Sequence, residues 1–414
     1  MGDRPHLEAG RGTLRIGGVQ AETLAAKYGT PLYVTDLDRV VERYKQAKKE
    51  LSSRYGNLNI AFAYKSNSTP EVVRALSREG AGATVVSVEG LRLARASGVK
   101  PRDVVLDGPS KTDEDLAAAI KMGVGMINAE SVQEVLVIEE LCSRLGVKEC
   151  RVGIRVNLDI LADTHAGLAT GARTHKFGVA REEAVEFCRS RAAGLKRAKI
   201  TGLHSHIGSQ VVEPSVFRTE AERLLELAEE IRGTVTVSEF NVGGGLGVSY
   251  SEEGREMPVS EYAEAVAGTF ARRAAGNPRL VSELGRWIVA DSTVLLTRVN
   301  FVKTAGDVTW ALVDAGMNTF LRPALYGANH MIVAAATANK AKSEAAYDIG
   351  GPVCESTDTF GSGRKLGVEL SRGDVVAILD AGAYGTSMSS TYNMRALPRT
   401  AVVSRGKTRL VPVS

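Results

Sequence analysis

Lys65 stands just after an apolar run, residues 58–63, that predicts a β-strand, and a helical pattern follows it. A lysine in this place would point its amine into a cleft, whereas most lysines lie on a solvated face. Partial loss of solvent makes such an amine a usable nucleophile toward a carbonyl group. Taken alone, the residue is equally compatible with a solvated lysine at a strand end.

Two histidines, His204 and His206, lie two residues apart in a later apolar run, residues 200–207. Alternate side chains of a strand face the same side, so both imidazoles would point the same way. No Asp, Glu or third His stands nearby with ligand spacing, and we therefore expect no bound metal. A flat imidazole can instead stack on an aromatic cofactor, or simply pack in the interior.

Three glycines, Gly243, Gly244 and Gly245, follow the apolar run 240–242. Residues without side chains let backbone N–H groups converge on an anion such as phosphate. The run does not fit the G-x-G-x-x-G dinucleotide pattern, and it lacks the Lys-Ser/Thr pair of a P-loop. It therefore indicates a mononucleotide-like or cofactor phosphate, with a tight turn that binds nothing as the alternative.

Glu283 and Arg286 come at the end of the last apolar run of this series, residues 280–284. A glutamate in an enclosed site is costly unless it has a partner. Opposite a pyridine nitrogen it would keep that nitrogen protonated, and a pyridinium ring is the electron sink that carbanion chemistry needs. The alternative is an ion pair between Glu283 and Arg286 at the rim.

The elements that would position these groups alternate between strand and helix. Helical patterns cover residues 69–78, 130–145, 182–189 and 216–232, between apolar runs at 58–63, 83–86, 104–106, 125–128, 152–156, 200–207, 240–242 and 280–284. Such alternation implies parallel strands, and eight units over roughly 250 residues have the count and size of a (β/α)8 barrel. An open doubly wound sheet is the competing arrangement.

In a barrel of this kind the C-terminal ends of the strands meet at one face. Lys65, His206, the glycine run and Glu283 would then lie together. An amine, a stacking ring, a phosphate-binding loop and a carboxylate are the groups that hold pyridoxal 5'-phosphate. The sequence therefore predicts an enzyme that uses this cofactor.

The last third of the chain has a different pattern. After about residue 286, β-like runs separated by Gly, Asn and Pro occur at 294–302, 310–314, 331–335, 347–349, 375–378 and 400–403. This pattern predicts a mostly antiparallel β domain, which the N-terminal stretch would join. We expect the barrel at residues 34–285 and the β domain at residues 1–33 and 286–414.

The composition excludes several classes of protein. The chain has 414 residues, of which 44% are hydrophobic and 24% charged, with a formal net charge of +4. This small, scattered charge argues against nucleic-acid binding. No apolar run reaches the ~20 residues of a membrane span, and the N-terminus lacks a signal-peptide core. The four cysteines are too widely spaced for a disulfide framework, so a cytoplasmic enzyme is expected.

The same residues resemble the fold type III pyridoxal-phosphate decarboxylases over nearly the whole chain. The cofactor runs are shared across that family, including its ornithine and arginine decarboxylases. Two C-terminal segments, residues 317–326 and 351–358, are similar to the substrate-carboxylate segment and the cysteine loop of its diaminopimelate decarboxylases. Glu355 discriminates between these groups, because the ornithine enzymes carry Asp after the cysteine.

The resemblance implies a role for each matching residue. It makes Lys65 the covalent anchor of the cofactor, His206 the stacking ring and Glu283 the partner of the pyridine nitrogen. It assigns the phosphate to Ser209, Gly243, Gly244 and Gly245, with Tyr384 adding a hydroxyl. It assigns the distal carboxylate of the substrate to Arg286, Arg322 and Tyr326, the distal amine to Glu355, and proton donation to Cys354. A homodimer with shared active sites is also implied.

Some positions depart from the family pattern. Thr84 stands where Asp is usual, the acid of the following run is displaced to Glu89 with Gly90 after it, and Asp107 replaces a more usual His. These positions border the cofactor cleft and are compatible with altered substrate choice or with ordinary drift.

The sequence thus favours decarboxylation of meso-2,6-diaminopimelate to L-lysine and leaves other activities open. One is decarboxylation of ornithine, lysine, arginine or a carrier-tethered amino acid. Another is a pyridoxal-phosphate-binding regulator without catalysis, which should have lost the lysine or the cysteine. An alanine-racemase-like enzyme would normally use a tyrosine as its second base.

Overall fold

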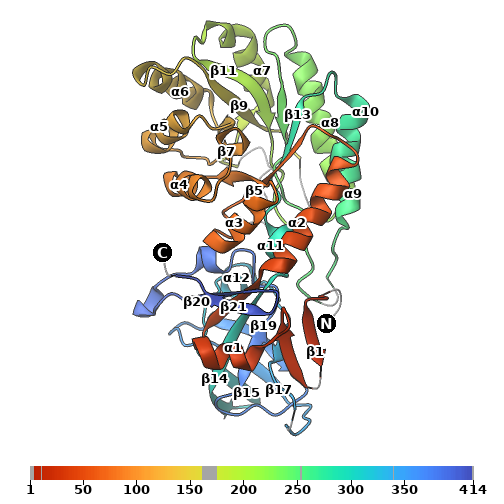
Figure 1. Cartoon of the computed structure of the whole chain (residues 1–414), viewed down its shortest axis with the longest axis vertical. Coiled ribbons are helices and arrows are strands. Elements are labelled where there is room, and N and C mark those ends of the chain that lie inside the picture. Colours follow the sequence, from red (N-terminus) through yellow and green to blue (C-terminus); the bar gives the residue numbers. More distant parts are fainter. Residues whose placement is uncertain (1–3, 11, 161–174, 252–253, 339, 413–414) are drawn as a thin grey trace.

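The computed structural model describes residues 4–10, 12–160, 175–251, 254–338 and 340–412. Eight parallel strands form a closed barrel in its upper part (Figure 1). In pairing order they are β5 (Leu58–Ala63), β6 (Gly82–Val85), β7 (Val104–Leu106), β8 (Met126–Ala129), β9 (Cys150–Asn157), β11 (Ala198–His204), β12 (Glu239–Asn241) and β13 (Arg279–Ser282), which returns to β5. The predicted barrel is confirmed, and the open sheet is wrong.

Helices surround the barrel. They are α2 (Leu37–Ser52), α3 (Pro70–Arg78), α4 (Val88–Ala96), α5 (Asp113–Met122), α6 (Val132–Arg144), α7 (Arg181–Ser190), α8 (Pro214–Glu230), α9 (Val259–Ala263), α10 (Thr269–Arg273) and α11 (Arg286–Val289). Local signals fix their ends: a capping box between Thr112 and Asp115 starts α5, and left-handed Gly123 ends it. No helix in the described part of the chain is long and apolar enough to span a membrane.

The lower part is the predicted β domain. Its main sheet contains β4 (Leu32–Asp36), β14 (Thr293–Ala305), β15 (Val308–Val313), β16 (Ile332–Ala334), β17 (Ala346–Gly350), β18 (Thr359–Lys365), β19 (Val375–Ile378), β20 (Arg399–Ser404) and β21 (Lys407–Leu410). Most pairs are antiparallel, while β4–β20 and β15–β17 are parallel. A small N-terminal sheet, β1 (Leu7–Gly10), β2 (Thr13–Ile16) and β3 (Val19–Gln20), packs on it together with helix α1 (Ala21–Tyr28).

Strand β4 belongs to the lower sheet, because it pairs with β14 and β20. The expected domain boundary at residue 34 falls inside this strand, and the first barrel helix, α2, begins at Leu37. The chain therefore enters the β domain, passes through the barrel and returns to the β domain.

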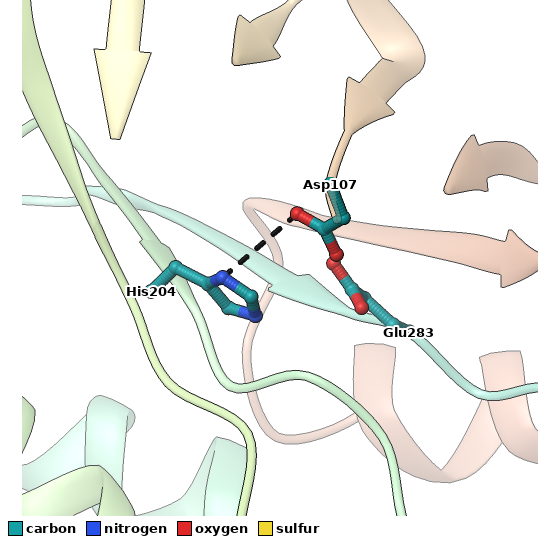
Figure 2. A group of neighbouring side chains, drawn as sticks. All are labelled: Asp107, His204 and Glu283. Carbon is teal, nitrogen blue, oxygen red and sulfur yellow. Dashed lines mark ion pairs between the residues drawn. The ribbon is translucent and has the colours of Figure 1, made fainter. Parts of the chain in front are cut away.

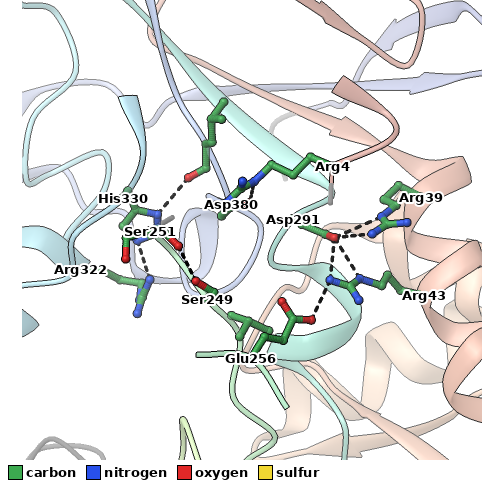
Figure 3. Close-up of polar contacts among 12 residues, drawn as sticks. Arg4, Arg39, Arg43, Ser249, Ser251, Glu256, Asp291, Arg322, His330 and Asp380 are labelled. Carbon is green, nitrogen blue, oxygen red and sulfur yellow. Dashed lines mark hydrogen bonds and ion pairs between the residues drawn. The ribbon is translucent and has the colours of Figure 1, made fainter. Parts of the chain in front are cut away.

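Buried ion pairs fasten the two parts where they meet (Figure 3). Asp291, between α11 and β14, accepts from Arg39 at 2.7 Å and pairs with Arg43 at 2.8 Å, both on α2. Beside these pairs, Arg4 of the N-terminal segment donates to Asp380 beyond β19 at 2.6 Å, which joins two segments of the β domain. Separating a buried ion pair leaves a charge without a partner, which is costly. The pairs between Asp291 and α2 therefore hold the barrel against the β domain.

Candidate active site

The predicted strand-end residues do face one region. Lys65 follows β5 and is exposed, while its neighbours Tyr64 and Ser66 are buried. The side chain is therefore less shielded from solvent than the partial desolvation expected from the sequence. Lys65 nevertheless lies close enough to the site for its positive charge to act on two buried groups, because it lowers the pKa of both His206 and Glu283.

Glu283 follows β13 and is buried together with Asp107, which follows β7 (Figure 2). Their carboxyl groups point toward each other, with oxygen atoms within 4.8 Å, and Glu283 accepts from the Asn241 amide at 2.7 Å. Burial, then the negative charge of Asp107, raises the pKa of Glu283 well above its ordinary value. The alternative Glu283–Arg286 ion pair is wrong, because Arg286 donates elsewhere.

Asp107 keeps its negative charge in this buried place. Burial raises the pKa of Asp107, but a proton on the neighbouring Glu283 carboxyl group, the positive charge of Arg155 and the Asn128 amide lower it below its ordinary value. The Asn128 amide also donates to Asp107 at 2.7 Å. Between the two buried acids, the proton therefore belongs to Glu283.

His204 lies on β11 next to this pair, with its Nδ1 3.8 Å from the Asp107 carboxylate. Neither ring nitrogen has a hydrogen-bond partner within the described part of the chain, and burial lowers the pKa of the imidazole to about 3. His204 is therefore neutral near pH 7. The sequence suggested no acidic neighbour for this histidine; the structure corrects that, because Asp107 and Glu283 arrive from distant strands.

His206 lies between the strand end and the glycine run. Its Nδ1 accepts a hydrogen bond from the backbone N–H of Gly244 at 3.3 Å, and burial lowers its pKa well below the ordinary value. The ring is thus neutral and held by the glycine loop, as a stacking group must be.

The glycines themselves are required by close backbone contacts. A Cβ atom on Gly244 would overlap the carbonyl oxygen of Glu283, and one on Gly245 would overlap that of Gly208. Gly243 has φ 56° and donates its N–H to the Asn241 side chain at 2.9 Å. The N–H groups of Gly243 and Gly244 therefore donate to other residues of the protein. The loop as a whole brings backbone without side chains to the site.

Arg286 begins α11 and is 5% exposed. Its guanidinium donates to Ser209 Oγ at 2.8 Å and to the Tyr250 hydroxyl at 2.8 Å, and it lies 4.7 Å from the Tyr384 ring centroid. Tyr384 takes a left-handed conformation, φ 57°, and its N–H donates to Ser66 O at 2.7 Å, close to Lys65. These contacts bring the predicted phosphate residues Ser209 and Tyr384 to one arginine.

Arg322, on helix α12 (Arg322–Tyr326), is the second buried arginine, 3% exposed. It lies 4.3 Å above the Tyr250 ring and donates to His330 Nε2 at 2.6 Å (Figure 3). His330 Nδ1 contacts Leu379 O at 2.9 Å, which fixes a neutral tautomer that accepts from the arginine. Burial, then the positive charge of Arg286, lowers the pKa of Arg322.

The β-domain residues of the predicted site divide into two groups. Tyr326 is half-buried and contributes to the electrostatics of both arginines. Cys354 and Glu355 lie on an exposed loop between β17 and β18, where Glu355 accepts from the Tyr392 hydroxyl. Asp358 shapes this loop by accepting from Val353 N at 2.6 Å.

The residues present fit pyridoxal phosphate. Two buried guanidinium groups, Arg286 and Arg322, have no carboxylate partner within the described residues, and the Arg322 Nε has no partner at all. Buried charges are nearly always paired, so this arrangement is built for anions. A neutral ring, His206, and a carboxyl group, Glu283, complete the set expected for a phosphorylated pyridine.

Sequence reasoning missed several members of the site. The sequence placed Asp107 at the cofactor cleft only as a departure from the family pattern and gave no role to Asn241; both stand at barrel strand ends, so the rule that pointed to Lys65 and Glu283 covers them. Tyr250 and His330 lie in loops with no such signal, and only the fold places them against the arginines.

Glu220 of α8 supports the strand end from behind the site. It is fully buried, accepts from Ser205 Oγ at 2.6 Å, and burial raises its pKa to about 8. The folded protein therefore holds this proton between pH 4.5 and 8 while the unfolded chain has lost it. Stability falls as pH rises through that window.

We expect Glu220→Gln to remove this cost and to increase the free energy of unfolding at pH 7 by up to about 3 kcal/mol. Urea unfolding at several pH values measures it, and the gain should vanish below pH 4.5. Glu226→Gln, an exposed change on the same helix, is the control. Equal gains at pH 4 and pH 8 would contradict the linkage.

The chain is similar in sequence and structure to known proteins. Residues 37–290 match the model of the family "Pyridoxal-dependent decarboxylase, pyridoxal binding domain". The diaminopimelate decarboxylase of Aquifex aeolicus is 37% identical over 98% of this chain and 94% of its own length, and that of Methanothermobacter thermautotrophicus is 38% identical over 98% and 94%. The crystal structure of the M. jannaschii diaminopimelate decarboxylase in co-complex with L-lysine superposes with a TM-score of 0.91, at 33% identity over 99% of this chain and 95% of that chain.

Proposed function

Because the chain belongs to the pyridoxal-dependent decarboxylase family, we propose that it is a diaminopimelate decarboxylase. It removes one carboxylate of meso-2,6-diaminopimelate as carbon dioxide and yields L-lysine, the last step of lysine biosynthesis. The similarity to diaminopimelate decarboxylases extends over both the barrel and the β domain. It therefore includes the segments proposed to bind the substrate as well as those proposed to bind the cofactor.

The two buried arginines carry this proposal. Arg286 and Arg322 both contact Tyr250 and have no carboxylate partner among the described residues. The cofactor phosphate, beside Ser209 and Tyr384, does not by itself neutralise both guanidinium groups, so a second anion is needed. Diaminopimelate supplies it with its distal carboxylate, which ornithine and lysine lack, and guanidinium groups suit such planar anions.

Within this site the barrel holds the cofactor. Lys65 anchors it covalently, His206 stacks on the ring, and Glu283 faces the ring nitrogen. Ser209, Tyr384 and the loop of Gly243, Gly244 and Gly245 hold the phosphate. When bound, the cofactor supplies an electron sink for the pair of electrons that decarboxylation leaves on carbon.

The β domain supplies the substrate groups. Arg286, Arg322 and Tyr326 bind the distal carboxylate, and His330 holds Arg322 in place. Cys354 delivers the proton to carbon, and Glu355 binds the distal ammonium. The division expected from the sequence, a barrel at 34–285 with flanking β segments, therefore separates cofactor binding from substrate recognition.

The exposed position of Cys354 and Glu355 supports a homodimer, in which this loop completes the site of the partner subunit. Apolar side chains are exposed beside it: Tyr392 at 45%, Met394 at 98% and Leu397 at 45%. Arg395, from the same segment, donates to Pro352 O next to Cys354. A subunit contact there would cover the apolar residues and place the loop. The four free thiols suit a reducing cytoplasm.

The direct test is to assay the cofactor-loaded protein against meso-diaminopimelate, L-lysine, L-ornithine and L-arginine, following carbon dioxide. Release from diaminopimelate alone is expected. Release from one of the other amino acids with none from diaminopimelate would overturn the proposal.

Arg322→Gln should impair recognition of the distal carboxylate. We expect KM for diaminopimelate to rise about 10- to 100-fold, because a hydrogen-bonded charge is lost, while the absorbance of the lysine-linked cofactor stays unchanged. Arg372→Gln, an exposed arginine of the β domain, is the matched control. An unchanged KM for Arg322→Gln would exclude this residue from substrate binding.

A further inference from the structure

The contact between Asp107 and Glu283 is the strongest feature that the proposed reaction does not explain. The two carboxyl groups come from β7 and β13, and both residues are almost fully buried, at 6% and 4% exposed. Each has an amide donor on its other side, Asn128 for Asp107 and Asn241 for Glu283, both at 2.7 Å. The two carboxyl groups point toward each other (Figure 2).

Two buried carboxyl groups that point at each other, with oxygen atoms within 4.8 Å, need a proton between them. Two anions at this distance would repel each other strongly in a buried site. The pair therefore carries one proton and a single negative charge, as coupled carboxyl dyads do. Asn241 is itself fixed by the Gly243 N–H, so the geometry of the pair is set by the glycine loop.

Other charged groups face this pair from several elements. Lys65 follows β5, Arg155 lies on β9, Lys111 follows β7, and His204 and His206 are neutral. Arg155 is already paired with Glu130 at 2.6 Å, and Lys111 with Glu134 at 2.7 Å. The carboxyl pair therefore lacks a cation of its own, and an additional positive charge beside it would be stabilised. A ring nitrogen that accepts the proton becomes that cation.

A metal ion is the competing occupant. One ligand atom from each of Asp107, His204 and Glu283 lies within 4.8 Å of the others. The carboxyl groups of Asp107 and Glu283 point directly at each other, whereas a bound ion would lie between them and hold them apart. The geometry favours a stored proton.

We propose that Asp107 is a positioning residue that acts through Glu283: the pair stores one proton and gives it to the ring nitrogen of the bound cofactor. The O–H bond of Glu283 breaks and leaves its electron pair on the carboxylate, while the nitrogen lone pair forms the new N–H bond. Two carboxylates then face the pyridinium, and Asp107 stabilises its charge. This inference rests on the cofactor of the proposed function.

Infrared difference spectroscopy of the wild-type protein, without and with pyridoxal phosphate, tests this. The apoprotein should show the carbonyl stretch of a protonated buried carboxyl group, and cofactor binding should remove it. Glu283→Gln should lack this change. Glu220→Gln should retain it, which separates the signal from the other buried protonated glutamate.

Asp107→Asn tests the positioning role. We expect the apoprotein band to shift or disappear, the cofactor dissociation constant to rise about 10- to 100-fold, and the nitrogen-15 resonance of labelled cofactor to move toward unprotonated pyridine. The inference is overturned if cofactor binding leaves the wild-type band in place, or if Asp107→Asn changes none of the three. One tightly bound divalent metal per chain, whose removal abolishes cofactor binding, would also overturn it.

The same experiment separates this inference from the proposed function. A band that Glu283→Gln removes establishes the stored proton without any catalytic assay. If the protein bound pyridoxal phosphate and lost the band but released no carbon dioxide from diaminopimelate, the proposed substrate would fail and the proton transfer would stand.

Discussion

Lys65→Ala is expected to abolish the absorbance band of the lysine-linked cofactor and to reduce decarboxylation by about 10³-fold or more, because a positioned amine is replaced by bulk solution chemistry. The fold should be unaffected, since Lys65 is exposed and makes no hydrogen bond or ion pair with the described residues. Absorbance spectra of the loaded protein and carbon dioxide release measure the two effects.

The matched control is Lys176→Ala, an exposed lysine that lies against the Phe177 ring. It should keep both the band and the activity. Borohydride reduction followed by peptide mass analysis should find the cofactor on Lys65. A band that persists in Lys65→Ala would mean that another lysine carries the cofactor.

Cys354→Ala is expected to lower kcat by about 10²- to 10⁴-fold, the usual contribution of a positioned proton donor. The cofactor band should remain, because Cys354 lies on a β-domain loop away from the cofactor residues. Cys354→Ser keeps the size of the side chain but not its acidity, so it should not restore the rate. A loss smaller than threefold would remove Cys354 from this role.

Mixing the two inactive variants tests the shared site. If Cys354 completes the site of the partner subunit, random exchange makes half of the dimers mixed, and each mixed dimer has one intact site. Activity should then recover to about a quarter of the wild-type value. No recovery, with exchange shown by mass, would place both groups in one subunit.

The sequence by itself determined the barrel and the parts of the site that stand at strand ends. Strand and helix periods are local, and closure of eight parallel strands brings their C-terminal ends together whatever the side chains are. Lys65, His206, Gly243 and Glu283 could therefore be placed in one region from order alone. Arg286 and Arg322 were found through similarity to a known family.

Some elements were missed for a local reason. Strand β18 contains Gly361 and Gly363, and β21 consists mostly of polar, exposed residues, so neither shows an apolar pattern. Strand β4 precedes the barrel in sequence but pairs with β14 and β20, since pairing depends on partners far along the chain.

Only the tertiary structure decided which charges meet. Contacts between side chains of distant strands depend on the register of the barrel and on side-chain rotamers, and no sequence period records either. The fold gave Glu283 a carboxyl partner in Asp107 instead of the rim arginine, and it gave Arg322 the neutral His330. It left Lys65 exposed while two arginines were buried without a counter-ion among the described residues, and that imbalance of charge makes the site a receptor for anions.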